Sequence, residues 1–357
     1  MNILLIGGTG RISMAVSKEL LKQGHTLYLL NRGNRNEALP GAVFLQADIE
    51  QEDTVRVLLG DLTFDAVADF IAFTPEQIQR DYRLFAGRTR QYIFVSSASA
   101  YQKPQKDYRI TENTPLENPY WAYSRNKIAC EEWLMEQYQK GNFPVTIVRP
   151  SHTYDERSVP VGLHGSHGSW QVVRRILAGK PVIIHGDGTS LWTMTHNSDF
   201  ARGFVGLVGN PAAIGEAVQI TSDESLTWNQ IYETLAEVLG AELHAVHVSS
   251  DFLAACSPYD LQGSLLGDKS ATVVFDNSKL KKLVPGFCAR KNLKEGMAEA
   301  VAFIMEHPEL QTEDLEFDAW CDRVMEARNQ ALQWMNSVKQ CNCSGTSIPG
   351  GGCEAKS

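Results

Sequence analysis

The sequence predicts an α/β protein with a doubly wound parallel sheet followed by a smaller, mostly helical C-terminal domain. Apolar runs of strand length alternate with helical segments up to about residue 150, a glycine-rich turn follows the first run, and helical patterns dominate the later chain. Such alternation is typical of a parallel sheet covered by helices on both faces. We expect a first domain at 1–160, to which later segments can return, a second region at 161–338 and a disordered tail at 339–357.

The amino-terminal 30 residues predict a strand, a glycine turn, a helix and a second strand. The apolar run 1–6 leads directly into Gly7-Gly-Thr-Gly-Arg-Ile-Ser13. A helical pattern follows, ends at Gly24 where a left-handed cap is expected, and gives way to the apolar run 26–30. Gly7 and Gly10 allow the backbone to approach a pyrophosphate, whose charge is favoured by the amides at the helix start. The unit predicts a dinucleotide site, with Ser13 at the third glycine position.

Later apolar runs predict the remaining strands at 43–46, 66–71, 92–95 and 145–148. A Gly, His and Ser-rich stretch at 161–169 then predicts a loop that is flexible or covers a ligand. Beyond it the sequence predicts a helix at 170–178, an apolar run at 181–185, a turn at 186–188 and helices at 228–239, 293–306 and 315–338.

Composition and charge exclude several classes of protein. The net charge of −9 argues against a surface that neutralises nucleic-acid phosphates. No run of 18 apolar residues and no basic leader before an apolar stretch is present, so we expect no membrane span and a cytoplasmic location. The scattered cysteines indicate reduced thiols. Cys341, Cys343 and Cys353 in the tail lack a nearby fourth ligand, which favours disorder over a metal site.

Tyr123 and Lys127 indicate the chemistry. Four residues apart on a helix, they share one face, so the ammonium can lower the pKa of the phenol. A phenol with a lowered pKa can exchange protons near neutral pH. The pair alone also fits an ordinary solvated helix, and the glycine turn upstream is what favours catalysis. Tyr120 is a less suitable candidate because Ser124, and not a lysine, follows it four residues later.

Four motifs in this order and spacing resemble the extended short-chain dehydrogenase/reductases, also called the NAD-dependent epimerase/dehydratase family. They are the glycine turn, Val95-Ser-Ser-Ala-Ser-Ala-Tyr101, the Tyr123 and Lys127 pair, and Val148-Arg-Pro150. The resemblance runs from Asn2 to about Pro308 and implies a Rossmann-type domain followed by a small substrate domain. Asn31-Arg-Gly33 and 70–75 resemble segments of the chloroplast stem-loop-binding type and its bacterial relatives.

The resemblance implies catalytic roles for three residues. Ser97 would hydrogen-bond a substrate oxygen, Tyr123 would exchange the proton, and Lys127 would lower the phenol pKa and hold the nicotinamide ribose. Ser97 also fits a strand-end serine that satisfies backbone groups, as do Ser96 and Ser99. The reaction class implied is hydride transfer at a carbinol or carbonyl carbon, with NAD(P) supplying the hydride chemistry.

The resemblance also implies a set of cofactor contacts. Asp48 would accept from the adenine amine, although it fits a helix N-cap equally well. Asn31 and Arg32 stand where a carboxylate would grip an unphosphorylated ribose, and a guanidinium can pair with a 2′-phosphate, which favours NADP over NAD. Arg35 is a further candidate. Besides these, the expected contacts are Gly7, Thr9, Gly10, Arg11 and Ile12 at the pyrophosphate, Ile49 at the adenine, Phe70, Ile71 and Ala72 on the adenosine side, and Tyr123, Lys127, Pro150 and Ser151 at the nicotinamide.

The substrate prediction rests on a departure from the family pattern. Sugar-nucleotide members usually carry an arginine four residues before a histidine, and counted from His196 that position is Trp192. An indole can stack on a sugar ring but cannot pair with a diphosphate. We therefore expect a small, polar, sugar-like substrate bound by Trp192 and Ser99, and not a nucleoside-diphosphate sugar. No metal is expected, because the loop histidines His152, His164 and His167 lack ligand spacing.

Three functions remain open at this stage. The first is an oxidoreductase or epimerase, the second an RNA-binding relative without redox activity, and the third a cofactor-sensing regulatory protein. The presence of Ser97, Tyr123 and Lys127 together with the acidic net charge favours the enzyme. A homodimer is expected by analogy with the family alone.

Overall fold

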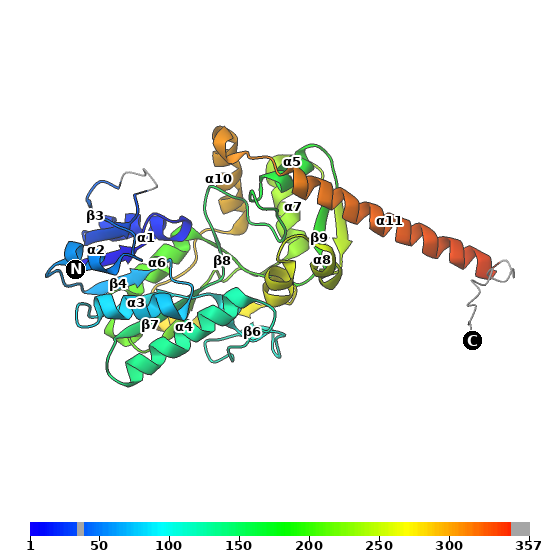
Figure 1. Cartoon of the computed structure of the whole chain (residues 1–357). Coiled ribbons are helices and arrows are strands. Elements are labelled where there is room, and N and C mark those ends of the chain that lie inside the picture. Colours follow the sequence, from blue (N-terminus) through cyan, green and yellow to red (C-terminus); the bar gives the residue numbers. More distant parts are fainter. Residues whose placement is uncertain (34–38, 344–357) are drawn as a thin grey trace, which may run out of the picture.

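The computed structural model describes residues 1–33 and 39–343 and consists of a sheet domain and a C-terminal domain (Figure 1). The first is built on a seven-stranded sheet in the order β12-β7-β5-β4-β1-β2-β3, in which every neighbouring pair is parallel. This confirms the predicted fold class. The strands are β1 (Asn2–Ile6), β2 (Thr26–Asn31), β3 (Ala42–Gln46), β4 (Ala66–Asp69), β5 (Tyr92–Val95), β7 (Val145–Pro150) and β12 (Ala217–Ile220).

Helices cover both faces of the sheet, and the first strand shows why. Successive side chains of a strand point to opposite faces, so Ile3 and Leu5 of β1 enter one hydrophobic core while Leu4 and Ile6 enter the other. The first core is completed by α1 (Arg11–Lys22), α6 (Asn197–Leu207) and α9 (Ser278–Leu283). The second is completed by α2 (Glu52–Leu59), α3 (Pro75–Phe85) and α4 (Ala122–Gln139).

Two late segments return to the sheet domain. Helix α6 packs against α1, and β12 then pairs with β7 at the edge of the sheet. The chain therefore crosses between the two domains more than once. The crossings are bridged by short strand pairs: β6 (Arg109–Ile110) with β15 (Val274–Phe275), β8 (His152–Tyr154) with β11 (Met194–His196), and β10 (Leu191–Trp192) with β13 (Leu226–Thr227).

The C-terminal domain is mostly helical and has a core of its own, which includes Trp192, Trp228 and Trp320. A two-stranded parallel ribbon lies within it. Its elements are α5 (Trp170–Leu177), β9 (Val182–His185), α7 (Trp228–Leu239), β14 (Ala245–Val248), α8 (Ser250–Cys256), the π-helical η3 (Gln262–Lys269), α10 (Leu293–Glu306) and α11 (Leu315–Cys343). Short 3₁₀ turns are η1 (Ala98–Ala100), η2 (Pro211–Ala213) and η4 (Pro308–Leu310).

The last helix is longer than its sequence pattern predicts. Figure 1 shows α11 extending away from the rest of the C-terminal domain, and it ends at Cys343, beyond the expected limit of 338. Of the expected tail at 339–357, the part from 344 onward, which includes Cys353, lies outside the described residues. Within the part of the chain that is described, no helix combines the length and the apolar character needed to span a membrane.

Candidate active site

The side chain of Ser13 closes the glycine turn after β1. This serine stands where the usual dinucleotide pattern has its third glycine. Ser13 Oγ donates to the Gly7 carbonyl over 2.6 Å and accepts from the Gly10 amide over 2.8 Å. Gly7 has a φ of 75°, and a Cβ atom at this position would lie 2.4 Å from Cγ2 of Ile71. The turn therefore needs glycine at 7, whereas a small hydroxyl side chain at 13 holds it together from within α1.

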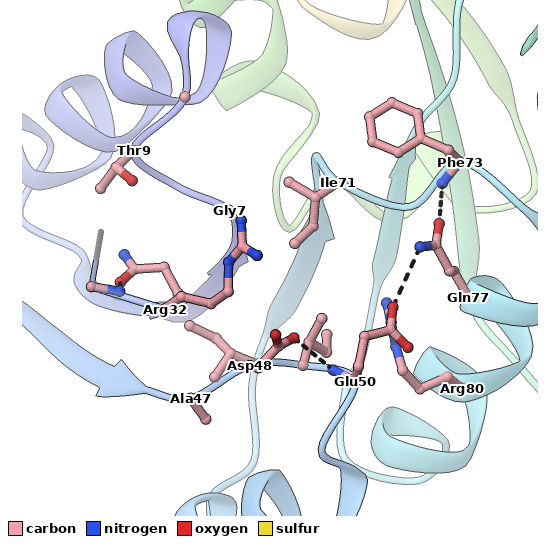
Figure 2. Close-up of a pocket in the computed structure, with 15 residues that line it drawn as sticks. Gly7, Thr9, Arg32, Ala47, Asp48, Glu50, Ile71, Phe73, Gln77 and Arg80 are labelled. Carbon is pink, nitrogen blue, oxygen red and sulfur yellow. Dashed lines mark hydrogen bonds and ion pairs between the residues drawn. The ribbon is translucent and has the colours of Figure 1, made fainter. Parts of the chain in front are cut away.

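A cavity of about 460 Å³ opens beside this turn, at the carboxyl ends of β1, β2 and β4 (Figure 2). Ligands of doubly wound sheets bind at this edge. We call it the turn cavity. Eight predicted cofactor residues line it: Gly7, Thr9, Gly10, Asn31, Arg32, Asp48, Ile49 and Ile71. Four polar or aromatic residues that the sequence did not single out also line it: Glu50, Phe73, Gln77 and Arg80.

The polar groups of the turn cavity fall into two sets. Figure 2 shows the Arg32 side chain projecting into the cavity. Asp48 accepts a hydrogen bond from the Glu50 amide over 3.1 Å, so it supports the turn after β3. On the opposite wall Arg80 pairs with Glu50 at 2.5 Å. Arg80 thus has an internal partner, whereas Arg32 offers its guanidinium to the cavity. Arg35 lies outside the described residues.

A second cavity of about 320 Å³ is lined by Ser97 and Tyr123, and we call it the Tyr123 cavity. The third predicted catalytic residue, Lys127, does not line it. Because Gly10 lines the first cavity and Ile12 the second, the two lie on either side of the start of α1. Predicted site residues in the second are Ile12, Ser97, Ser99, Tyr123, Pro150, Ser151 and Trp192. Residues that sequence reasoning missed include Lys103, Trp121, His152, Asp268 and Lys269.

A chain of hydroxyl groups positions Ser97. Its Oγ shares a 2.9 Å hydrogen bond with Ser99 Oγ, which also accepts from Ser124 Oγ on α4 over 2.8 Å. Ser97 Oγ further accepts from the Ser99 amide over 3.2 Å. The structure therefore places the predicted substrate contact Ser99 behind Ser97 as a buried hydrogen-bond partner as well as on the cavity wall.

The pKa of Tyr123 is shifted in the direction opposite to the one that the Tyr-Lys spacing suggested. Burial raises the pKa of this phenol, a hydrogen bond with Ser97 lowers it in part, and the charge of Asp268 raises it further. In the polypeptide by itself, Tyr123 is therefore a neutral phenol at physiological pH. A neutral phenol can donate a proton to a substrate oxygen.

Lys127 is buried against backbone carbonyls and aromatic faces. Its Nζ donates to the carbonyl oxygens of Ala72 at 2.7 Å and Val95 at 2.8 Å. It also lies 4.6 Å from the ring centroid of Phe73 and 5.8 Å from that of Tyr123. Burial lowers the pKa of Lys127 to about 8, an effect that the nearby Asp69 charge opposes.

Four predicted cofactor residues lie outside the walls of both cavities, and Lys127, described above, is one of them. Phe70 packs on Phe204 with ring centroids 5.2 Å apart. Ala72 is buried and contributes its carbonyl to Lys127. Arg11 is exposed and donates to Ser158 Oγ over 3.2 Å, which links the start of α1 to the loop after β8.

The three histidines of this region have different surroundings. His152 lines the Tyr123 cavity, and burial lowers its pKa to about 3, so the imidazole is neutral. His164 Nδ1 bonds the Gly165 carbonyl and His167 Nδ1 the Glu313 carbonyl. Across residues 1–33 and 39–343, no three His, Cys, Asp or Glu side chains gather in a way that could hold a metal ion.

Comparison with known proteins decides the family. The family model described as "NAD dependent epimerase/dehydratase family" matches residues 3–221. The chain belongs to this family. The fold and the resemblance predicted from the sequence are thereby confirmed, and with them an NAD-dependent enzyme of the epimerase/dehydratase type.

Relatives of this epimerase/dehydratase family member include enzymes and a protein named for stem-loop binding. The 2'-dehydrokanamycin reductase of Streptomyces kanamyceticus is 26% identical over 301 residues, which cover 81% of each chain. The chloroplast stem-loop binding protein of 41 kDa b of Arabidopsis thaliana is 26% identical over 252 residues, or 67% of this chain and 63% of the relative.

Solved structures share the fold. The UDP-glucuronic acid 4-epimerase from Bacillus cereus, solved in complex with UDP-glucuronic acid and NAD, superposes with a TM-score of 0.68. The match covers 86% of this chain and 99% of the epimerase, at 20% identity. At that identity the likeness concerns the arrangement of the two domains and not the substrate.

Proposed function

We propose that the protein is an NAD(P)-dependent oxidoreductase or epimerase that acts on a carbinol or carbonyl carbon of a small, sugar-like substrate. The observation that carries the proposal is that Ser97 and Tyr123 line one cavity together with Pro150 and Ser151. This cavity lies across the start of α1 from the turn cavity. A dinucleotide bound along the glycine turn would have room to extend from one to the other.

The residues present fit such a dinucleotide. The turn at Gly7 leaves no space for a side chain, and α1 begins directly after Gly10, where backbone amides favour a pyrophosphate. Asp48 and Ile49 would hold the adenine end, and Arg32 would pair with a 2′-phosphate, which supports a preference for NADP. When bound, the nicotinamide supplies or accepts the hydride.

The proton chemistry belongs to Tyr123. A phenol whose pKa is raised by burial suits the acid role, in which its proton passes to the carbonyl oxygen of the substrate as that group becomes an alcohol. Ser97 would donate a hydrogen bond to the same oxygen. This assignment favours carbonyl reduction over the reverse reaction, and a reductase is among the relatives.

The substrate is proposed to be a sugar or glycoside with a ketone or aldehyde group. Trp192 lies on the cavity wall, at the position where an arginine would serve a diphosphate, and an indole cannot pair with a diphosphate. One relative is named as acting on a dehydrogenated kanamycin. Sugar-like carbonyl compounds without a nucleotide are therefore the first compounds to test.

Native mass spectrometry of the purified protein, followed by denaturation, tests the cofactor. A co-purifying mass equal to NADP, or NADPH oxidation with a sugar ketone panel, supports a reductase. A tightly held NAD with no net oxidation favours an epimerase. If neither NAD nor NADP binds at millimolar concentration in a calorimetric titration, the proposal is wrong.

RNA binding is the second candidate, because one relative is named as a stem-loop binding protein. The net charge of −9 works against it. A gel shift with a stem-loop RNA at physiological salt decides between the two functions, since an enzyme of the proposed type should show no shifted band.

A further inference from the structure

Two donors on buried side chains of the Tyr123 cavity, the Lys103 ammonium and the Trp192 indole N–H, have no hydrogen-bond acceptor among the described residues. Lys103 is 4% exposed, and its ammonium donates no hydrogen bond to any residue in the described part of the chain. Trp192 is 3% exposed, and its indole Nε1 is buried without a partner there. Lys103 Nζ lies 6.0 Å from the centroid of the Trp192 ring, so the two donors are neighbours.

Buried donors of this kind are rare in folded proteins, because a donor taken out of water without an acceptor destabilises the fold. Where such a group borders a cavity, a ligand that supplies the acceptor is one explanation for its retention. Both side chains lie on the wall of the cavity that holds Ser97 and Tyr123. Their missing acceptor is thus expected to come from the molecule that enters that cavity.

The charges around the cavity specify the kind of acceptor. Its wall carries two lysines, Lys103 and Lys269, and one carboxylate, Asp268. Their formal charges leave one positive charge in excess. Among the described residues no ion pair within 4.0 Å joins Asp268 to either lysine, although its charge acts on both of them through space. No other charged side chain lines the described wall of this cavity, and the imidazole of His152 is neutral.

We propose that Lys103 and Trp192 bind a carboxylate of the substrate, and that the natural substrate is a sugar acid with a single negative charge. The inference rests on the proposed function, because it concerns the substrate of the same cavity. Lys103 would pair with one carboxylate oxygen, and the indole N–H of Trp192 would donate to a neighbouring oxygen. Asp268 would accept from sugar hydroxyl groups and thereby disfavour ligands with a second negative charge.

The test measures binding and not turnover. The probes are D-glucuronate, D-galacturonate and D-gluconate, each compared with its neutral amide, with D-glucose 6-phosphate as the phosphate arm. They are titrated calorimetrically into the full chain saturated with NADP. We expect at least one acid to bind about tenfold or more tightly than its amide, and Lys103→Met to abolish that preference.

Matched variants separate a charge effect from a general loss of structure. Lys106→Met removes an exposed lysine from the same segment and should leave the preference intact. Lys103→Arg should retain the preference for the acid. Trp192→Phe keeps an aromatic ring but loses the N–H, so it should weaken binding of the acid roughly threefold and leave binding of the amide unchanged. Circular dichroism confirms that each variant is folded.

Several outcomes would overturn the inference. They are equal binding of all acids and amides, binding of none of the acids, an unchanged preference in Lys103→Met, and Lys103-dependent binding of glucose 6-phosphate alone. None of these outcomes bears on the proposed role of Tyr123 as proton donor. That proposal is contradicted separately if Tyr123→Phe retains wild-type reduction of a sugar ketone. Tyr123→Phe should keep the acid preference, because its hydroxyl is no part of the anion site.

Discussion

The ammonium of Lys127 lies 5.8 Å from the centroid of the Tyr123 ring and is held there by two backbone carbonyls. One carbonyl, that of Ala72, follows β4, and the other, that of Val95, ends β5. The lysine therefore fastens α4, which carries Tyr123, to the carboxyl ends of two neighbouring strands. Its first role in the polypeptide is to position the tyrosine, and a role toward a nicotinamide ribose stays a proposal.

Tyr123→Phe should lower kcat by roughly 100- to 10,000-fold, the range for loss of a general acid. Dinucleotide affinity should change less than twofold, because the ring and its packing on Trp121 remain. Steady-state kinetics on a sugar ketone and a calorimetric NADP titration measure the two quantities. Tyr120→Phe is the control and should match the wild type. A fully active Tyr123→Phe variant would remove the basis for the proposed chemistry.

Ser97→Ala should reduce kcat roughly 100-fold through loss of a hydrogen bond to the reacting oxygen. Ser96→Ala is a close control, since Ser96 is the adjacent residue and its buried Oγ has no partner among the described residues. That variant should keep its activity and be at least as stable as the wild type in urea denaturation. Equal losses in both variants would show that Ser97 has only a structural role.

The burial of Lys127 predicts a pH dependence of stability. Its pKa is about 8 in the folded protein, below the usual value near 10.4 of an unfolded chain. Between these two values the unfolded state binds more protons, so the contribution of Lys127 to the free energy of unfolding rises with pH, by about 1 kcal/mol per pH unit.

Lys127→Met should lack this rise. Urea unfolding of the wild type and of Lys127→Met at pH 7.5, 8.5 and 9.5 gives the difference between their free energies of unfolding. In this difference the contributions of the other titrating groups cancel. A difference that does not change with pH would mean that the folded pKa of Lys127 is unshifted.

Arg32→Ala should weaken NADP binding roughly 10- to 100-fold, the equivalent of one charge-assisted hydrogen bond, while NAD binding stays within twofold. Asn31→Asp should weaken NADP and strengthen NAD, because a carboxylate repels the 2′-phosphate and accepts from a ribose hydroxyl. Calorimetric titration with both dinucleotides provides the comparison. Equal effects of Arg32→Ala on the two would place the guanidinium away from the 2′ position.

Glu131→Gln should destabilise the protein by about 3 to 5 kcal/mol, because it leaves a buried arginine without its counter-charge. Arg149 of β7 and Glu131 of α4 are both buried and approach within 2.5 Å. Glu136→Gln, which breaks an exposed pair with Lys140 on the same helix, should change the free energy of unfolding by less than about 0.5 kcal/mol. Chemical denaturation measures both. Similar losses would mean that the buried pair is solvated.

The sequence alone determined the elements whose signals are local. The glycine turn, the strands β1 to β5 and β7, and the helix that carries Tyr123 follow from local patterns within a few residues. The family followed from the order of four such motifs. Element ends were less accurate, as in α11, because a helix that extends from the body continues without the tertiary contacts that would end it.

Only the tertiary structure decided which distant residues share the cavities. Lys103, Trp192 and Asp268 come from segments with no common motif, and the crossings of the chain between its two domains bring them to Tyr123. The return of β12 to the sheet was likewise set by packing. The directions of the pKa shifts of Tyr123 and Lys127 also depended on folding, because burial outweighs the nearby charges and burial arises only when remote segments pack together.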